Sequence, residues 1–280
     1  MYVGFLTAPM SGRPLSQVLE WAAREGFAGI EVAVAEGSAH ADAATLRAEA
    51  GAAVRRRAAD AGVRLTGLTY FGNLTPEEPA AAARVRAYAR TILEACHELG
   101  TVACLQAGHP WKGRTREDMV RGPAGELLQD LAAQAEALGV RIALENWTPT
   151  NIGHAGLWDL LFETVPSSAL GLNFDPSHLL WQGADPIQAV SRYGDRIGHV
   201  HAKDTWIDRV RLARAGVLAD GWWRFTVPGD GMLDWHAFTG VLRAAGYDGV
   251  LSIEHEDDDF DTETGLRRGL AFLQPYCRRA

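Results

Sequence analysis

Three features are scarce or missing in this sequence, and each absence excludes a class of protein. The three cysteines, Cys96, Cys104 and Cys277, cannot all pair and lack zinc-finger spacing, so we expect a reducing compartment, the cytoplasm. No run of about 18 apolar residues exists that would cross a membrane. The first residues, MYVGFLTAPM, lack the basic segment and long apolar core of a secretory signal, so we predict neither secretion nor membrane insertion.

Basic charge is also scarce, with 27 Lys and Arg residues against 35 Asp and Glu residues and a net charge of −8. Because nucleic-acid-binding proteins normally present a basic surface, we expect no nucleic-acid partner. A glycine-rich phosphate loop is absent, which favours a substrate without phosphate. At 280 residues the chain suits one large α/β barrel or two ordinary domains, and no linker or low-complexity tract indicates two.

Short apolar segments alternate with amphipathic segments along the whole chain. Strands buried on both faces are predicted at residues 2–6, 29–33, 64–68, 102–106, 141–145, 170–175, 197–201 and 249–254. Apolar spacings of three and four predict helices at residues 15–25, 44–61, 80–99, 125–138, 157–165, 186–193, 235–245 and 263–276. The alternation predicts an α/β fold, a single (β/α)8 TIM barrel of parallel strands over residues 1–280, with a doubly wound open sheet as the alternative.

Four apolar segments in the second half of the chain each end with a side chain that can bind a divalent metal. The segments are RIALENW, LGLNFDPSH, IGHVHAKD and GVLSIEHED, and the side chains are Glu145, Asp175, His201 and Glu254. Because the parallel strands of a barrel all end at one rim, these side chains can meet around one ion. Taken singly, a Glu at a strand end also suits a salt bridge or cap, and Asp before Pro is also an ordinary turn signature.

Further polar side chains lie next to these four. The segment HVHAKD places His199, His201 and Lys203 on one side of a strand, because side chains alternate with period two. We interpret His199, the deepest, as a hydrogen-bonded core residue and expect Lys203 at the mouth of the barrel. Beyond Asp175, a turn that contains proline presents His178 on the same rim.

One imidazole and three carboxylates form an oxygen-rich donor set. Such a set favours Mn²⁺, with Mg²⁺ or Co²⁺ as alternatives, over the sulfur-rich sites of structural zinc. The sequence therefore predicts one divalent metal ion, Mn²⁺ before the others, as the cofactor.

At these residues the chain resembles the sugar phosphate isomerase/epimerase family. These xylose isomerase-like barrels include ketose 3-epimerases, hydroxypyruvate isomerase and inosose dehydratase. The resemblance spans essentially the whole chain, and it is carried by the segments ALEN, NFDPSH, HVHAKD, PGDGMLDWHAF, GYDGVLSIEHED and GFAGIEV. It implies that Glu145, Asp175, His201 and Glu254 bind one divalent metal, and that the two glutamates move protons on opposite sides of a bound sugar.

Such a site supports proton transfer next to a carbonyl group. A metal chelated by a carbonyl oxygen and the adjacent hydroxyl acidifies the neighbouring C–H and stabilises an enediolate. We assign the acid and base roles to Glu145 and Glu254, in an order left open. His178 orients the substrate oxygen in this hypothesis, and a helix-capping role is its alternative. Proton return to the same carbon epimerises a sugar, return to the adjacent carbon isomerises it, and loss of a β-hydroxyl dehydrates it.

We therefore predict a sugar isomerase or epimerase that acts on a keto-sugar or cyclitol. The alternative is a metal-dependent lyase or dehydratase, similar to inosose dehydratase or to a subunit of an enzyme that cleaves 3-keto-glycosides. Trp faces stack on sugars, and Arg and Lys reach hydroxyl groups. On this basis His109, Trp111, Lys203 and Arg224 are predicted to bind the substrate, with core packing as the alternative for any single tryptophan.

Two more distant alternatives are a nuclease, which would bind nucleic acid, and a barrel that acts only with a partner subunit. An apurinic-site endonuclease-like nuclease shares this barrel and several motifs, but the third strand ends in LTGLTYFGN without a histidine. The acidic net charge also disfavours a nuclease. A partner-dependent barrel is the other alternative, and we leave open a homo-oligomer or a small partner subunit. The long connection over residues 205–222 is expected to form a lid or a subunit contact.

Overall fold

Eight parallel strands close into a barrel, in which the first and last of them pair. This computed structural model describes residues 1–277, and for residues 48 and 49 it describes the backbone alone. Around the barrel the order is β1-β10-β7-β6-β5-β4-β3-β2. The barrel strands are β1 (Tyr2–Leu6), β2 (Gly29–Ala33), β3 (Arg64–Tyr70), β4 (Ala103–Gln106), β5 (Ile142–Glu145), β6 (Leu170–Phe174), β7 (Ile197–Ala202) and β10 (Val250–Ile253).

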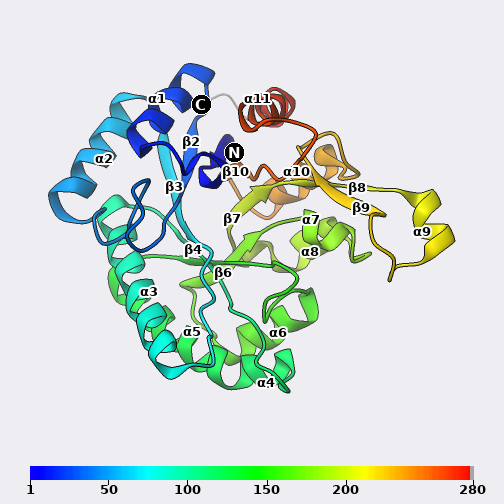
Figure 1. Cartoon of the computed structure of the whole chain (residues 1–280), viewed down its shortest axis with the longest axis horizontal. Coiled ribbons are helices and arrows are strands. Elements are labelled where there is room, and N and C mark those ends of the chain that lie inside the picture. Colours follow the sequence, from blue (N-terminus) through cyan, green and yellow to red (C-terminus); the bar gives the residue numbers. More distant parts are fainter. Residues whose placement is uncertain (278–280) are drawn as a thin grey trace.

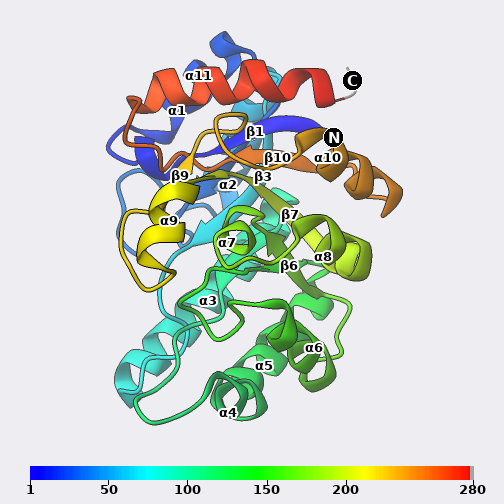
Figure 2. The ribbon, with the colours of Figure 1, turned by 90° about the vertical axis from the view of Figure 1, so that its right-hand side faces the viewer.

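Helices surround the strands on the outside of the barrel (Figure 1). Helices α1 and α11 lie on one side of it, and α3 to α6 lie on the other (Figure 2). Within residues 1–277, no helix combines the length and apolar character that crossing a lipid bilayer requires. The helices are α1 (Leu15–Glu25), α2 (Ala48–Asp60), α3 (Pro79–Leu99), α4 (Arg116–Arg121), α5 (Pro123–Leu138), α6 (Ala155–Thr164), α7 (Ser177–Leu180), α8 (Pro186–Tyr193), α9 (Arg209–Ala215), α10 (Trp235–Ala244) and α11 (Thr262–Leu273), with short 3₁₀ turns η1 (Ala8–Met10), η2 (Gly194–Arg196) and η3 (Gln274–Tyr276).

The predicted barrel is confirmed, and the open doubly wound sheet is excluded. Strand ends differ from the prediction by one or two residues. Strand β3, for example, continues to Tyr70 because Thr69 and Tyr70 still pair with β4. The single domain over residues 1–280 stays a prediction, and its last three residues lie outside the described part.

Glycines end several helices. Gly26 after α1 has a φ of 86°, and its N–H reaches the carbonyls of Ala22 and Ala23. Gly139 after α5 has a φ of 66° and closes that helix in the same way. A left-handed residue at these positions caps the free carbonyls and turns the chain into the next strand.

One predicted helix is wrong at its beginning. Residues 44–61 were expected to be helical, yet α2 begins at residue 48. The carboxylate of Asp42 accepts the backbone N–H groups of Gly37, at 2.8 Å, and Ala44, at 3.0 Å. It also accepts the hydroxyl of Tyr88 at 3.1 Å. This local turn competes with the helix for the same backbone groups, which is the usual effect of Asp near a helix start.

Replacing Asp42 with asparagine is expected to destabilise the protein by about 1–3 kcal/mol at pH 7, because an amide N–H₂ would face the Gly37 N–H. Burial raises the pKa of Asp42, but the two backbone N–H groups outweigh it and lower that pKa. A carboxyl group whose pKa is lower in the folded state stabilises the folded protein at pH values above the pKa of the unfolded state, about 4. This contribution is lost as the pH falls through the folded-state pKa. Urea unfolding of wild-type and Asp42→Asn at pH 7 and pH 3 checks this prediction. If the difference in the free energy of unfolding between the two proteins does not shrink at pH 3, the prediction is wrong.

The connection between β7 and α10 carries a hairpin that is not part of the barrel. Strands β8 (Asp204–Ile207) and β9 (Trp223–Thr226) pair antiparallel, and α9 lies between them at the edge of the molecule (Figure 1). The carboxylate of Asp204 anchors the base of this hairpin through the indole N–H of Trp235, at 2.8 Å. Trp223 of β9 stacks on Trp181, with ring centroids 4.6 Å apart. The hairpin therefore rests on the segment that follows β6.

Candidate metal centre and pocket

The four predicted metal ligands converge at the carboxyl-terminal rim of neighbouring strands. Glu145 ends β5, Asp175 follows β6, His201 lies near the end of β7, and Glu254 follows β10. One ligand atom from each lies within 4.8 Å of the others, and all four residues are buried. The convergence arises because β5, β6, β7 and β10 are consecutive in the barrel. That they bind a metal remains a prediction.

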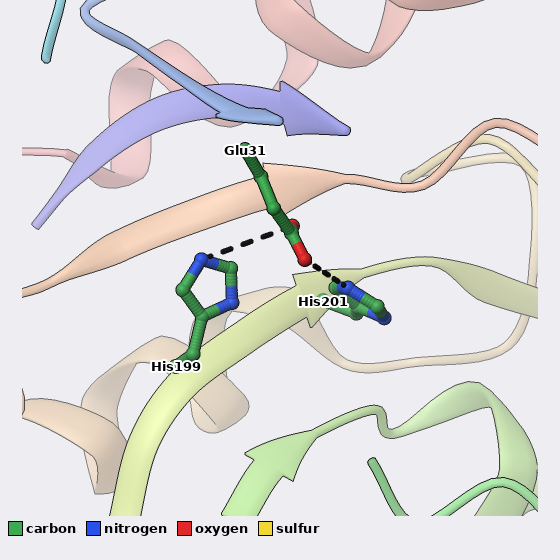
Figure 3. Close-up of side chains that lie close together, drawn as sticks. All are labelled: Glu31, His199 and His201. Atoms are coloured by element: carbon green, nitrogen blue, oxygen red, sulfur yellow. Dashed lines mark hydrogen bonds and ion pairs between the residues drawn. The ribbon is translucent and has the colours of Figure 1, made fainter. Parts of the chain in front are cut away.

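His201 directs its Nδ1 atom at the three carboxylates. The distances from Nδ1 are 3.0 Å to Oε2 of Glu254, 3.5 Å to Oε1 of Glu145 and 4.0 Å to Oδ2 of Asp175. Its other nitrogen, Nε2, faces Glu31 deeper in the barrel (Figure 3). Burial lowers the pKa of His201, but the carboxylates of Glu31 and Glu254 outweigh it and raise that pKa well above its usual value.

Asp175 is held in place by the asparagine of the ALEN segment. The side chain of Asn146 accepts the backbone N–H of Asp175 at 2.7 Å and donates to its carbonyl at 2.9 Å. The Oδ1 atom of Asp175 accepts the N–H of Ser177 at 2.8 Å. These bonds orient the carboxylate so that Oδ2 faces the other three side chains.

The donor set fits a hard divalent cation. Among the described residues, Oδ2 of Asp175, Nδ1 of His201 and Nε2 of His178 are buried atoms that make no hydrogen bond. Their closest partners are charged groups of the same cluster, such as Glu254 at 3.0 Å from Nδ1 of His201 and Lys203 at 3.2 Å from Oδ2 of Asp175. Buried polar atoms are normally hydrogen-bonded, so three such atoms directed at one space fit an ion between them. Three carboxylates and one imidazole are the ligands that such an ion uses in proteins.

Lys203 supplies the positive charge now facing these carboxylates. Its Nζ lies 2.7 Å from Glu254, 3.2 Å from Asp175 and 2.9 Å from Glu256. Burial lowers the pKa of Lys203, but Asp175 and Glu254 outweigh it and raise that pKa well above its usual value. The side chain was expected at the open mouth; with 1% of the residue exposed, it lies in the floor of the pocket instead.

The two glutamates occupy different electrostatic environments. Burial raises the pKa of Glu145, but the rings of His178 and His201 outweigh it, and the pKa lies well below its usual value. Burial also raises the pKa of Glu254, and the opposing charges of Lys203 and His201 do not compensate fully.

His178 lies beside the predicted metal ligands, on the rim where the sequence placed it. Its Nε2 is 3.6 Å from Oε1 of Glu145 and 3.5 Å from Oδ2 of Asp175. Phe225 of β9 packs edge-on against the imidazole, with ring centroids 5.1 Å apart. The hairpin thus holds His178 with its Nε2 toward the carboxylates, a position from which it can contact a small ligand.

A cavity of about 180 Å³ opens directly above these residues. Its walls combine two aromatic side chains with charged and polar groups. The residues that line the cavity are Phe71, Gln106, Glu145, Trp147, His178, Lys203, Glu254 and Glu256. A space of this size and polarity suits a small polar molecule.

Two predicted substrate-binding residues on the loop after β4 are not among the described residues that line this cavity. The His109 ring contacts Trp147 edge-on at 5.5 Å and so supports the cavity wall from behind. The indole N–H of Trp111 donates to the carbonyl of Thr75 at 2.7 Å, which ties two rim loops together. Their binding of substrate remains a prediction.

Arg224, the third such residue, is directed away from the cavity. Side chains alternate along β9, so Trp223 and Phe225 face α7, whereas Arg224 lies on the opposite face. Its guanidinium pairs with Asp257 at 2.9 Å and with Asp259 at 2.6 Å. Only Lys203 of the four predicted substrate-binding residues lines the cavity.

The sequence interpretation missed several residues of the site. Phe71, Trp147 and Glu256 line the cavity, and each lies one to three residues beyond the end of a barrel strand. The rule used for the metal ligands, applied to aromatic side chains, would have found Phe71 and Trp147. Glu31 lies in β2 below the rim, so the rule cannot find it.

Relatives in other organisms match part of this chain. Uncharacterized protein YfiH of Bacillus subtilis (strain 168) is 38% identical over 155 residues, or 51% of this chain and 49% of that protein. An inosose dehydratase of Lacticaseibacillus casei is 31% identical over 137 residues, or 47% of this chain and 45% of that protein. The chain therefore spans about half the length of the curated relatives it matches.

Solved structures match nearly the whole chain in fold. The IolI protein, crystallised with a zinc atom, superposes with a TM-score of 0.76 at 18% identity, over 99% of this chain and 96% of that one. The 3-keto-D-glucoside 4-epimerase YcjR from E. coli, in its apo form, superposes with a TM-score of 0.76 at 20% identity, over 98% of this chain and 99% of that one. At such low identity these likenesses show the fold.

The family match agrees with the fold seen here. The family described as xylose isomerase-like TIM barrel matches residues 19–276. These residues run from α1 to the end of η3 and include seven of the eight barrel strands. The chain belongs to the xylose isomerase-like TIM barrel family.

Proposed function

We propose that this protein is a divalent-metal-dependent isomerase or epimerase of a keto-sugar or cyclitol. The observation that carries the proposal is the buried set of Glu145, Asp175, His201 and Glu254 at the floor of a small cavity. A divalent ion held by this set would supply Lewis-acid stabilisation of the negative charge that develops when a C–H next to a carbonyl loses its proton. The family resemblance and the relatives named above support this reaction class.

The side chains of this protein supply the proton transfers. Glu145 and Glu254 come from strands on either side of β6 and β7, so they flank the cavity floor. One removes the proton next to the substrate carbonyl, and the other returns a proton from the opposite face. His178 and Lys203 line the same cavity and hold the substrate oxygens by hydrogen bonds. Phe71 and Trp147 exclude water and offer apolar faces to the C–H groups of a sugar.

A lyase is the second candidate, because the same arrangement eliminates a β-hydroxyl group once the proton is removed. The inosose dehydratase similarity over about half of each chain favours it. A nuclease is not favoured, since β3 is followed by Phe71 where that alternative would need a histidine, and the net charge is −8. Mn²⁺ as the ion, the cytoplasm as the location and the absence of a nucleic-acid or membrane partner are parts of this proposal.

Deuterium exchange tests the proposed reaction. The metal-stripped protein is incubated in D₂O with ketoses, 3-keto-sugars and inososes, with and without Mn²⁺, and C–H exchange is followed by NMR. We expect deuterium uptake next to the carbonyl only when metal is present. The product then distinguishes epimerisation, isomerisation and dehydration.

Metal binding is measured on the same samples. If one Mn²⁺ binds per chain and no compound in the panel exchanges or changes, the proton-transfer proposal is wrong for this substrate class. A reaction of 3-keto-glycosides that requires an added second subunit would identify the partner-dependent lyase instead.

A further inference from the structure

Glu31 is a buried carboxylate in the first half of the chain that belongs neither to the predicted metal ligands nor to the cavity lining. It lies in β2, fully inaccessible to solvent, and faces Nε2 of His201 (Figure 3). The carboxylates of Glu145 and Glu254 lie at the other ring nitrogen, Nδ1.

The pairing of β2 with β3 shifts register between Ile30 and Glu31. At the facing Gly67, an added Cβ would lie 3.5 Å from Cγ of Glu31 and 3.6 Å from Nε2 of His199. Glu31 and His199 therefore pack directly over the backbone of β3 at this glycine.

Every contact of the Glu31 carboxylate is with a group that can donate a hydrogen bond. Oε1 accepts the hydroxyl of Thr69 and lies 3.0 Å from Nε2 of His201. Oε2 accepts the hydroxyl of Ser252 and lies 3.8 Å from Nε2 of His199. Two strands, β3 and β10, thus fix the carboxylate through hydroxyl groups, while β7 presents both imidazoles to it. The group is held rigidly as an acceptor.

We propose that Glu31 is a positioning residue for the metal ligand His201, an inference that rests on the proposed metal site. Only one ring nitrogen of a neutral imidazole carries a proton, and a metal needs the other. When Glu31 accepts the hydrogen bond of Nε2–H, a neutral His201 keeps the lone pair of Nδ1 for an ion held among Glu145, Asp175 and Glu254. Carboxylates that bind the far nitrogen of a metal-ligating histidine fix its orientation and increase its basicity.

A proton on Nε2 of His201 also sets the donor and acceptor roles of the polar groups around His199 and His201. The amide of Asn173 lies between the rings, with its Nδ2 2.9 Å from Nε2 of His201 and its Oδ1 3.0 Å from Nδ1 of His199. When Nε2 of His201 carries its proton, a half-turn of this amide gives both contacts a donor and an acceptor, and the two amide orientations have nearly the same shape. His199 then accepts from Asn173 and directs its Nε2–H at Glu31. In this arrangement the single Nε2–H of His201 is shared between Glu31, at 3.0 Å, and the amide oxygen of Asn173. The Nε2 of His199 lies 3.8 Å from Glu31, a charge contact and not a hydrogen bond.

Metal affinity of a Glu31→Gln variant tests the proposal. Wild-type protein is titrated first with Mn²⁺ in competition with a chelator; failure of wild-type to bind would overturn the proposed metal site itself. If wild-type binds one ion, we expect the variant to bind it roughly 10–100-fold more weakly. Asp42→Asn is the matched control, since it also converts a buried, hydrogen-bonded carboxylate to an amide, but one whose hydrogen-bond partners are Gly37, Ala44 and Tyr88 instead of His201. Equal affinity in Glu31→Gln and wild-type, or equal losses in both variants, overturns the positioning role alone.

The protonation of His201 can also be measured in the wild-type protein, so this test does not depend on the folding of a variant. In the zinc-loaded protein, long-range ¹H–¹⁵N NMR of the histidine rings is expected to show His201 with its proton on Nε2 and the metal on Nδ1. Metal on Nε2 contradicts the proposal. So does a stoichiometry of two ions per chain, because Glu31, His199 and His201 also lie close enough to hold an ion, and Glu31 would then be a ligand.

Discussion

Replacing Glu254 with glutamine is expected to lower kcat by about 10²–10⁴-fold in the deuterium-exchange assay. Glutamine has nearly the same shape but cannot accept the proton, and general acid–base groups contribute about 10²–10⁴-fold. The change also removes one of the three carboxylates around the predicted ion, so metal affinity falls as well. Saturating Mn²⁺ separates the two effects, since it restores occupancy but not the proton transfer. Glu145→Gln is expected to behave in the same way.

The control for this prediction removes one negative charge outside the candidate site. Asp258 lies in the exposed acidic loop a few residues beyond Glu254, outside the residues that line the cavity. Asp258→Asn removes one negative charge and is expected to keep kcat close to wild-type. A Glu254→Gln protein that still exchanges at the wild-type rate with saturating metal would remove Glu254 from the mechanism.

Replacing Lys203 with methionine is expected to destabilise the metal-free protein by about 3–5 kcal/mol, the range seen when one partner of a buried ion pair is removed. The reason is that Asp175 and Glu254 would remain buried beside each other without the ammonium group 3.2 Å and 2.7 Å away. Divalent metal is expected to restore more stability to this variant than it adds to wild-type, because the ion replaces the missing charge. Urea unfolding with Mn²⁺ and with a chelator measures both differences.

The chain contains a lysine suited to the matching control. Lys112 is exposed in the loop after β4, so Lys112→Met makes the same chemical change where no buried carboxylate depends on it. Its free energy of unfolding is expected to equal that of wild-type. If Lys203→Met is equally stable without metal, the carboxylates do not need a buried counter-charge, and the electrostatic account of the site is wrong.

The convergence of the four candidate metal ligands could be predicted from the sequence because each is tied to a local pattern. Glu145 and Glu254 end apolar segments, and the ends of parallel strands in a barrel meet at one rim. The same rule could not tell which rim residues point inward. Arg224 illustrates this, because its strand β9 belongs to a hairpin outside the barrel, and the alternation along β9 directs it to Asp257 rather than to the cavity.

By itself the sequence determined the alternation of strands and helices and the positions of the four candidate ligands at strand ends, since these depend on periodicity and on residues next to one another. Only the tertiary structure decided that Lys203 is buried among carboxylates and that Glu31 faces His201, 170 residues away along the chain. Contacts of that kind depend on strand register and side-chain direction. A shift of one residue reverses the face of every side chain in a strand, and no local pattern records which register the closed barrel selects.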